Sequence, residues 1–364
     1  MYVHELENWP KFLWDQNGLA NLLTQLHHQQ GRLIGSMESI GIHVQEETIL
    51  QTLTRDVVKS SEIEGEILDP SLVRSSVARH LGIEVAAVNS RDKNVEGIVE
   101  LMLDASQKFD QPLTKERLLR WHTFLFPVGR KDFSKIKVGS WRTGLVQVVS
   151  GQMGDEIVHF EAVSAERVEY EMELFLDWFN YDMNMDQILK AAIAHLWFVT
   201  IHPFDDGNGR IGRAIGDLML ARSEKSSRRF YSLSAQIQLE RKKYYNILEK
   251  TQKGSLDITS WIEWFLGCLG RSIETALTTF GILVHKVQFW EAHEKASFND
   301  RQRKVVNCLL DGFEGKLTSS KWAKIVKCSQ DTAYRDIQDL MNQEILMKNL
   351  EGGRSTSYSL ISIE

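Results

Sequence analysis

The sequence predicts a mostly α-helical protein with more than one domain. Apolar residues recur at helical spacing over long segments, and only five prolines interrupt a chain of 364 residues. Clear strand patterns are confined to two places, one inside the helical region and one near the C-terminal end. A chain of this length forms two or three separate cores. Its 43% hydrophobic and 25% charged residues are typical of a globular protein.

Charge and cysteine content exclude several classes of protein. The net charge of −6 gives no overall positive field for nucleic acid or an anionic membrane, so such binding would have to be local. Three cysteines without paired spacing indicate neither a disulfide framework nor a cysteine-based zinc site, and His27, His28 and His122 have no carboxylate or cysteine at ligand spacing. Residues 1–15 lack the pattern of a secretory signal, and the most apolar stretch, 188–201, is too short to span a bilayer. We therefore expect a cytoplasmic protein that makes no membrane contact.

Two amphipathic helices are expected in the N-terminal region. Leucines between positions 19 and 33 mark the buried face of the first helix. Leu50, Leu53 and Val57 mark the second helix, which runs toward residues 60–65, and Pro70 is expected to close the region.

A β-hairpin set among helices is expected next. Residues 145–149 and 157–160 are rich in β-branched and aromatic side chains, and turn-forming residues occupy 151–155 between them. Ser164 is then the expected N-cap of a helix whose apolar face extends over residues 168–179.

Residues 202–213, "HPFDDGNGRIGR", follow the apolar helix at 188–201 and hold an unusual density of glycines and charges. A dinucleotide fingerprint needs a strand before its glycines and an acidic residue about 20 positions later, whereas here a helix precedes and Asp217 comes too early. A P-loop needs a lysine followed by serine or threonine, which is missing. The spacing of apolar residues from Ile211 to Leu218 instead predicts a loop that enters a helix, whose unpaired N–H groups form an anion site.

The charged side chains of this segment suit attack on a nucleotide phosphate. Arg210 and Arg213 are three positions apart, so both can point at one anion. Asp206 is a hard oxygen ligand of the kind that binds Mg²⁺ together with phosphates. His202 can accept a proton near neutral pH from an attacking hydroxyl. Each residue alone could be structural, but the combination predicts a catalytic site.

The segment resembles the Fic motif H-P-F-x-[D/E]-G-N-G-R-x-x-R and matches all nine specified positions. The resemblance implies a Fic-type helical bundle with a β-hairpin flap. It also implies a protein adenylyltransferase that moves AMP from ATP to a Ser, Thr or Tyr hydroxyl of a target protein or of itself. In that scheme His202 is the base, and Asp206 is the Mg²⁺ ligand. Residues assigned to nucleotide binding by their place in the motif are Gly207, Asn208, Gly209, Arg210, Ile211, Gly212 and Arg213, with Arg210 and Arg213 on the outer phosphates.

The resemblance extends to both sides of the motif. The segment "GSWRTGLVQVVSG" is similar to the family's flap, and a hairpin edge there can hold a target peptide by strand addition. Flap residues expected at the target are Val146, Gln147 and Val148. Residues expected at the adenine and ribose are Tyr244, Tyr245 and Gln252, although core packing is the alternative for Tyr244.

A built-in restraint is expected at the end of the second helix. A carboxylate at the end of a buried stripe needs a cation, because an unpaired buried charge is costly. Ser60-x-x-x-Glu64-Gly65 resembles the family's inhibitory motif [S/T]-x-x-x-E-[G/N], which pairs the glutamate with the second arginine of the motif. Here that arginine is Arg213, so we expect ATP to bind unproductively in the resting protein. The alternative is an exposed acid at a helix end. Some family members with this motif also remove AMP, and the sequence does not rank the two directions.

The C-terminal region resembles a winged helix. Residues 321–342 predict helix, turn and helix, and a strand pair at 345–349 and 357–361, joined by 351–354, would be the wing. From residue 298 onward, 10 Lys/Arg stand against 9 Asp/Glu. The second helix also carries three aspartates, which makes a poor surface for phosphates and favours a protein-interaction role. A DNA-binding regulator that uses the nucleotide site as a sensor is the alternative. The aspartates are Asp331, Asp336 and Asp339.

The predicted organisation therefore has three parts. Residues 1–85 form an N-terminal helical region with the inhibitory helix, 86–296 the Fic catalytic domain, and 297–364 the winged-helix-like domain. The expected ligands are ATP and Mg²⁺, and the expected partner is a target protein that the sequence does not identify. The oligomeric state stays open, with a homodimer among the options.

Overall fold

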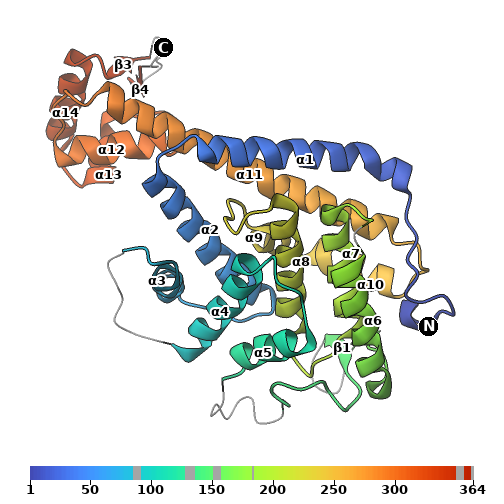
Figure 1. The fold of residues 1–364 in the computed structure, drawn as a ribbon. Helices are drawn as coiled ribbons and strands as arrows, with labels where there is room; N and C mark the ends of the chain where they lie inside the picture. Colours follow the sequence, from blue (N-terminus) through green and yellow to red (C-terminus); the bar gives the residue numbers. More distant parts are fainter. Residues whose placement is uncertain (85–91, 128–135, 151–156, 183, 350–355, 362–364) are drawn as a thin grey trace. The chain divides into compact units, whose positions relative to one another are not determined.

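The computed structural model describes residues 1–84, 92–127, 136–150, 157–182, 184–349 and 356–361. It confirms the mostly helical fold class (Figure 1). The chain divides into two compact units, Met1–Ala276 and Leu277–Glu364. The sequence predicted a boundary near residue 297, which lies later in the chain. The observed division falls inside helix α11, Thr259–Ala292, which continues across it without a break.

The N-terminal helices follow a short 3-10 turn, η1, at Val3–Glu5. Helix α1, Gln16–Glu38, begins where Asp15 Oδ1 accepts from the Gly18 N–H at 2.9 Å. Helix α2, Ile42–Ile63, buries the predicted stripe of apolar residues. Our expectation for Pro70 was wrong, because Pro70 begins helix α3, Pro70–Leu81. The first turn of a helix tolerates proline, since its missing N–H has no partner there.

The hairpin lies between two groups of helices. Helices α4, Lys93–Gln107, and α5, Lys115–Leu125, precede it. Strands β1, Gln147–Ser150, and β2, Ile157–Glu161, pair antiparallel, with a register shift between Val148 and Val149. The predicted turn at 151–155 lies outside the described residues.

Helix α6, Val168–Tyr181, starts later than the sequence indicated. A 3-10 turn, η3, occupies Ala165–Arg167, and the Ser164 side chain makes no capping hydrogen bond. The predicted side-chain cap at Ser164 is therefore wrong, because the extra turn separates this residue from the helix.

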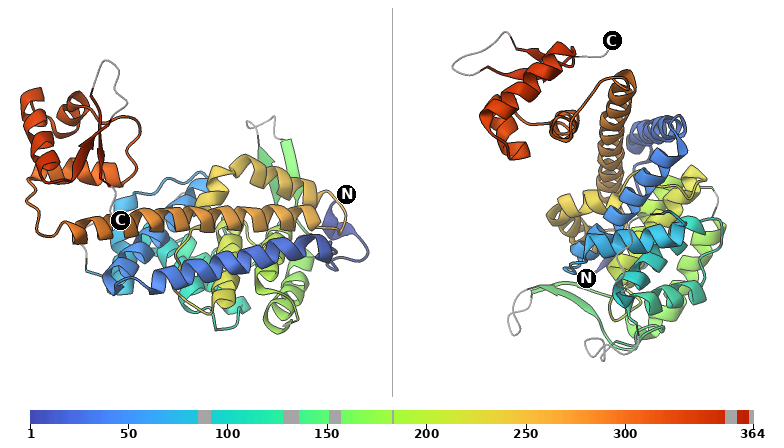
Figure 2. Two further views of the ribbon diagram at one scale, coloured as in Figure 1. Left: turned by 90° about the horizontal axis from the view of Figure 1, so that it is seen from above. Right: turned by 90° about the vertical axis from the view of Figure 1, so that its left-hand side faces the viewer.

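Two helices form the centre of the first unit. Every residue from Ile188 to Ile201 of helix α7, Gln187–Ile201, is buried, and α7 packs along helix α8, Asn208–Glu224. Helices α9, Leu233–Leu239, and α10, Arg241–Gln252, follow. The first part of α11 lies beside α1 (Figure 2), where a Cβ on Gly270 would stand 3.3 Å from Leu26 Cδ2. Among the helices that the structure describes, none is long and apolar enough to cross a membrane.

The second unit contains the elements expected of the C-terminal module, in the expected order. These elements are α12, Asp300–Leu310; α13, Ser319–Val326; α14, Gln330–Asn342; β3, Leu346–Lys348; and β4, Tyr358–Leu360. The strands pair antiparallel, and Leu317 adds an isolated bridge to Tyr358. The predicted turn at 351–354 lies outside the described residues.

One of the three aspartates on α14 is not part of its surface. Asp336 is only 5% exposed, and Arg301 donates to both of its oxygens at 2.8 Å. The Arg301 side chain and the Asn299 amide hold the pKa of Asp336 below its usual range against the effect of burial. From the sequence, three aspartates predicted that α14 is a poor surface for phosphates, but Asp336 is buried and does not belong to that surface.

Candidate functional site

His202 stands at the end of α7 in a conformation that turns the chain sharply. Its φ is +55°, which is uncommon for a residue other than glycine, and its N–H donates to Phe198 O at 2.9 Å. Nδ1 lies 3.0 Å from the carbonyl oxygen of Val199. Because a carbonyl only accepts, Nδ1 carries the proton and Nε2 is left as a base. Burial lowers the pKa of His202, so the ring is neutral at pH 7.

The loop after His202 is fixed by side chains that bond to its backbone. Asn208 accepts from the Phe204 N–H at 3.0 Å and donates to the Phe204 carbonyl at 2.8 Å. The Phe204 ring stacks on His122 with centroids 4.2 Å apart. Gly207 has a φ of +83°, and a Cβ there would stand 2.9 Å from Leu125 Cδ1, so glycine is required at this position. Asn208 therefore stabilises the loop through its side chain and is also the first residue of helix α8.

Arg142 is a functional residue that the sequence analysis missed. It is 2% exposed and donates to the carbonyls of His202, at 2.7 Å, and Gly144, at 2.8 Å. It also bonds the carbonyls of Val163 and Ile201. The buried Arg142 guanidinium thus connects the chain beside the hairpin to the backbone of His202, the residue predicted to accept the proton. Its position just before the hairpin, in "SWRTG", gave no separate signal.

Helix α8 presents its N-terminus to the site, as the anion-site prediction requires. The N–H groups of its first turn have no carbonyl partner within the helix, and the helix dipole favours an anion there. Asp206 is exposed just before this turn and accepts from the Gly207 N–H at 2.5 Å. The residues that the structure describes hold no cluster of three or more His, Cys, Asp or Glu that could bind a metal by themselves. A single exposed carboxylate beside an anion site fits Mg²⁺, which commonly shares its shell with phosphates and water.

The two motif arginines pair with two different glutamates. Arg213 Nη1 lies 2.7 Å from Glu64 Oε1, while its Nε and Nη2 donate to the hydroxyl and carbonyl of Ser60 at 3.0 and 2.7 Å. Arg210 Nη1 lies 2.8 Å from Glu66 Oε2. The expectation that both arginines point at one anion is therefore not met in this structure. Glu66 was missed because the inhibitory pattern ends at Gly65.

Glu64 lies against the start of α8. A Cβ on Gly209 would stand 2.1 Å from Glu64 Oε1, so the carboxylate lies directly over the helix N-terminus. Burial alone would raise the pKa of Glu64, but the Arg213 guanidinium outweighs it and lowers the pKa. The same pair keeps Arg213 charged despite its burial. The carboxylate is therefore ionised where a nucleotide phosphate would bind.

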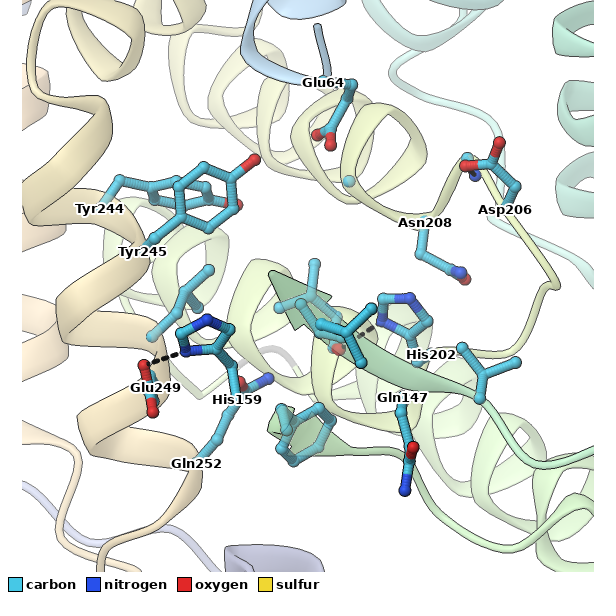
Figure 3. A pocket seen from close by; sticks show the side chains of 18 of the residues that line it. Glu64, Gln147, His159, His202, Asp206, Asn208, Tyr244, Tyr245, Glu249 and Gln252 are labelled. Carbon is cyan, nitrogen blue, oxygen red and sulfur yellow. Dashed lines mark hydrogen bonds and ion pairs between the residues drawn. The ribbon is translucent and has the colours of Figure 1, made fainter. Parts of the chain in front are cut away.

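A cavity of about 850 Å³ brings most of the predicted residues together (Figure 3). This volume is in the range of small-molecule sites. The predicted residues that line it are Glu64, Val146, Gln147, Val148, His202, Asp206, Gly207, Asn208, Gly209, Tyr244, Tyr245 and Gln252. Ile211 is fully buried, and Gly212 packs against Val199, where a Cβ would stand 2.8 Å from Cγ1. These two residues fit helix packing rather than contact with a nucleotide.

The α10 side of the cavity combines two buried residues with one that is partly exposed. Tyr244 is 2% exposed, and its hydroxyl bonds to His195 Nε2 at 2.9 Å, which fits the packing alternative for this residue. Tyr245 is 36% exposed and donates to the carbonyl of Ile63 at 3.3 Å. Gln252 is 5% exposed and donates to Thr200 Oγ1 at 3.3 Å.

One pair that the sequence analysis missed joins the hairpin to α10. His159 Nδ1, on β2, lies 2.8 Å from Glu249 Oε2, and both residues line the cavity (Figure 3). The two residues are far apart in the sequence and belong to no motif, so nothing in the sequence indicated the contact.

Comparison with known families gives two matches along the chain. Residues 112–220 match the Fic/DOC family, and residues 2–83 match a domain of unknown function designated DUF4172. The Fic/DOC match contains the whole loop from His202 to Arg213 and the hairpin. Helix α2, whose C-cap is Glu64, lies inside the other match.

Two relatives illustrate the similarity of sequence. The protein adenylyltransferase fic-1 of Caenorhabditis briggsae is 28% identical over 218 residues, which is 56% of this chain and 39% of that protein. Its counterpart in Caenorhabditis elegans is 30% identical over 197 residues, which is 50% of this chain and 35% of that protein. The chain therefore spans less than half the length of these relatives.

Solved structures share the fold. A Fic family protein from Desulfovibrio desulfuricans G20 superposes with a TM-score of 0.54 at 21% identity, over 94% of this chain and 97% of that chain. A Fic domain containing signaling protein from Bacteroides thetaiotaomicron gives a TM-score of 0.54 at 20% identity, over 71% of this chain and 97% of that chain. These likenesses show a shared fold, and residues 112–220 are the part of the chain that matches the Fic/DOC family.

Proposed function

We propose that this protein is an ATP-dependent protein adenylyltransferase. The observation that carries the proposal is one cavity that joins a neutral His202, the N-terminus of α8, the exposed Asp206 and the β1 edge. The proposal is supported by the Fic/DOC match and by relatives named protein adenylyltransferase.

The reaction follows from the position of each group. His202 Nε2 takes the proton of a target Ser, Thr or Tyr hydroxyl, whose oxygen forms a new bond to the α-phosphorus of ATP. The bond from that phosphorus to the β-phosphate oxygen breaks, and pyrophosphate leaves. The N–H groups of Asn208 and Gly209 would stabilise the charge on the phosphate oxygens, because the Gly207 N–H donates to Asp206 Oδ1. Asp206 would hold a Mg²⁺ ion, which neutralises phosphate charge when bound.

The target would bind to β1 as an added strand. β1 pairs with β2 on one side, and its other edge pairs with no strand in the part of the chain that the structure describes. Val146, Gln147 and Val148 line the cavity next to His202. An extended target segment on this edge would carry its hydroxyl toward Nε2.

Glu64 would keep the resting enzyme weakly active. Its carboxylate occupies Arg213 and lies over Gly209, so the outer phosphates of ATP would meet a negative charge and lose a cationic partner. ATP would then bind with its α-phosphorus misplaced for attack.

The test is transfer from α-labelled ATP to protein in host lysate and to the enzyme itself. Glu64→Gly should increase labelling at least about tenfold, the effect of freeing one charge-assisted phosphate contact. His202→Ala should abolish it in both backgrounds. Glu47→Gln is the control, because Glu47 lies on α2, pairs with Arg74 of α3 at 2.7 Å and contacts no motif arginine. Equal labelling by wild type and Glu64→Gly would sink the restraint, and labelling that survives His202→Ala would sink the mechanism. Incubating labelled protein with each variant measures AMP removal.

A second candidate function concerns the C-terminal unit alone. With Asp336 inside, the exposed residues of α14 include Gln330, Tyr334 and Arg335, and Lys324 and Lys327 are exposed next to them. Glutamine and arginine read base edges, and lysines contact phosphates, so we infer duplex DNA as a ligand alongside the protein-interaction role. Selection of bound fragments from a random duplex library would test it. Arg335→Ala should lower affinity for an enriched sequence, and no enrichment would leave the protein-interaction role.

A further inference from the structure

The turn after α2 places two carboxylates on either side of one glycine. The Glu66 N–H donates to Ser61 O at 3.0 Å, and the Gly65 N–H donates to Glu62 O at 3.0 Å. With Gly65 at a φ of +85°, this is the Schellman ending of a helix. The reversal at Gly65 carries Glu64 and Glu66 to two successive arginines of α8.

Arg210 is turned away from the cavity by this turn. Its guanidinium lies 2.8 Å from Glu66 and 5.4 Å above the ring of Phe126. Neither Arg210 nor Arg213 lines the cavity, although Gly209 does, and Arg210 pairs with Glu66 rather than Glu64. The arginine expected at the outer phosphates is therefore held behind the phosphate site.

Arg210 does not have the bonding of a structural arginine. Arg142 and Arg213 each use Nε and both terminal nitrogens as donors. Within the described part of the chain, the Arg210 side chain donates only from Nη1, and its Nε is buried without an acceptor. A buried donor without a partner is unfavourable, so another position of this side chain can compete.

Glu66 is placed so that it can release Arg210. Its side chain is 28% exposed, compared with 9% for Arg210, and it also accepts from the Asn94 amide at the start of α4. Water can solvate the Glu66 carboxylate when the pair opens, which keeps the cost of opening small.

We propose that Glu66 is a second restraining residue, which acts by holding Arg210 out of the nucleotide cavity. Glu64 neutralises Arg213 and Glu66 neutralises Arg210, so one turn occupies both outer-phosphate cations. Removing Glu64 alone leaves Arg210 paired, and ATP gains its complete set of contacts only when both glutamates are replaced. This inference rests on the proposed nucleotide site, but its test needs no transfer reaction.

The experiment is calorimetric binding of Mg·ATP and of AMP to Glu64→Gln, Glu66→Gln and the double variant, all in the His202→Ala background to prevent turnover. AMP lacks the outer phosphates, so it reports on a general change of the pocket. Compared with Glu64→Gln, the double variant should bind ATP about tenfold more tightly, the effect of one charge-assisted contact, with AMP affinity unchanged. The Glu66→Gln change removes the charge but keeps the side-chain shape and an oxygen that can accept from Asn94. Glu66→Ala is the second variant if that change is silent.

Two further arms separate the explanations. Adding Arg210→Ala to the double variant should remove the extra ATP affinity, because the effect passes through that side chain. If Glu66→Gln and Glu66→Ala leave ATP affinity unchanged beside Glu64→Gln, or tighten AMP equally, the inference is overturned. If ATP affinity responds as expected but Glu64→Gly with an intact His202 transfers no label, the proposed function fails while the inference stands.

Discussion

The α8 end and the α10 end of the cavity are built in different ways. At the α8 end, Asn208, Arg142 and Arg213 are buried and make short hydrogen bonds to backbone or side-chain partners. At the α10 end, Tyr244 and Gln252 are buried as well, but Tyr245 is 36% exposed and reaches the Ile63 carbonyl at 3.3 Å. The proposed phosphate transfer needs fixed dipoles, which the first end provides. At the second end, the partly exposed Tyr245 can move at little energetic cost.

The first prediction concerns Arg142, a side chain that holds the α8 end of the cavity in place. Arg142→Met removes the donors to four carbonyls, of which those of Val163 and Ile201 are buried. Each buried carbonyl left unpaired costs about 1–3 kcal/mol, so the free energy of unfolding should fall by at least about 2 kcal/mol. The rate of AMP transfer per folded molecule should fall by roughly 100-fold, because the His202 carbonyl loses the Arg142 hydrogen bond that holds its backbone in place. Urea unfolding and initial labelling rates in the Glu64→Gly background measure the two effects.

Arg117→Met is the control for this prediction. Arg117 is similarly buried, at 5% exposed, and bonds several carbonyls, but it pairs with Asp104, away from the cavity. It should lose comparable stability and keep its transfer rate per folded molecule. Equal rate losses in both variants would mean that Arg142 acts only through stability.

The difference between the two ends explains what the sequence could predict. At the α8 end, His202, Asp206 and Gly207–Gly209 are contiguous, and local backbone geometry fixes their relation. The helix, the loop and the phosphate side of the site therefore followed from one short segment, whereas Glu64 and the flap and α10 residues followed from the family resemblance. Glu66, Arg142 and the His159–Glu249 pair depend on contacts between distant segments, which periodicity and spacing do not encode.

The same reasoning accounts for the errors in the fold. Leu50, Leu53 and Val57 predicted α2, because a helical stripe is a local signal. Pro70 was misassigned because proline suits a helix start as well as a break, and only the chain around it decides. Arg210 and Arg213 share a helix turn, but two acids in the turn after α2 pair with them separately. Local spacing could not show that separation.

The second prediction concerns Gly65, which lies between Glu64 and Glu66, the two residues proposed to restrain the enzyme. Gly65→Ala places a Cβ at a φ of +85°, which should cost roughly 1–2 kcal/mol of stability. The strained turn should displace Glu64 and Glu66 together, so self-labelling should rise several-fold. Gly82→Ala is the matched control, since Gly82 ends α3 at a φ of +70°, and neither position has a neighbour within 4 Å of the added atom. Equal labelling in the two variants, at equal loss of stability, would contradict a role for the turn.

The third prediction uses the pH dependence of stability to test whether the buried His122, which stacks on Phe204, is neutral in the folded protein. Burial lowers the pKa of His122 to about 4, whereas a histidine in the unfolded chain titrates near 6.5. Below pH 6.5 the unfolded chain binds a proton that the folded chain does not, so this residue makes the wild type less stable as the pH falls. Between pH 7 and pH 5.5, the stability difference between wild type and His122→Phe should shift by about 1 kcal/mol in favour of the variant. Leu118→Ala, a truncation on the same helix, should show a difference that does not change with pH. A constant difference for His122→Phe would contradict the buried, neutral state.

The fourth prediction tests the adjustable end and has the smallest effect. Tyr245→Phe removes a hydroxyl that donates to the last carbonyl of α2 at 3.3 Å, on a side chain that is 36% exposed. The Arg241 Nε still donates to the same carbonyl at 2.9 Å, so the loss of stability should be about 0.5 kcal/mol and self-labelling should rise no more than about twofold. Tyr170→Phe, at a side chain 61% exposed on α6, should change neither quantity. A Tyr245→Phe effect as large as that of Gly65→Ala would show that the α10 end holds the inhibitory helix as firmly as the turn does, and the contrast between the two ends would then fail.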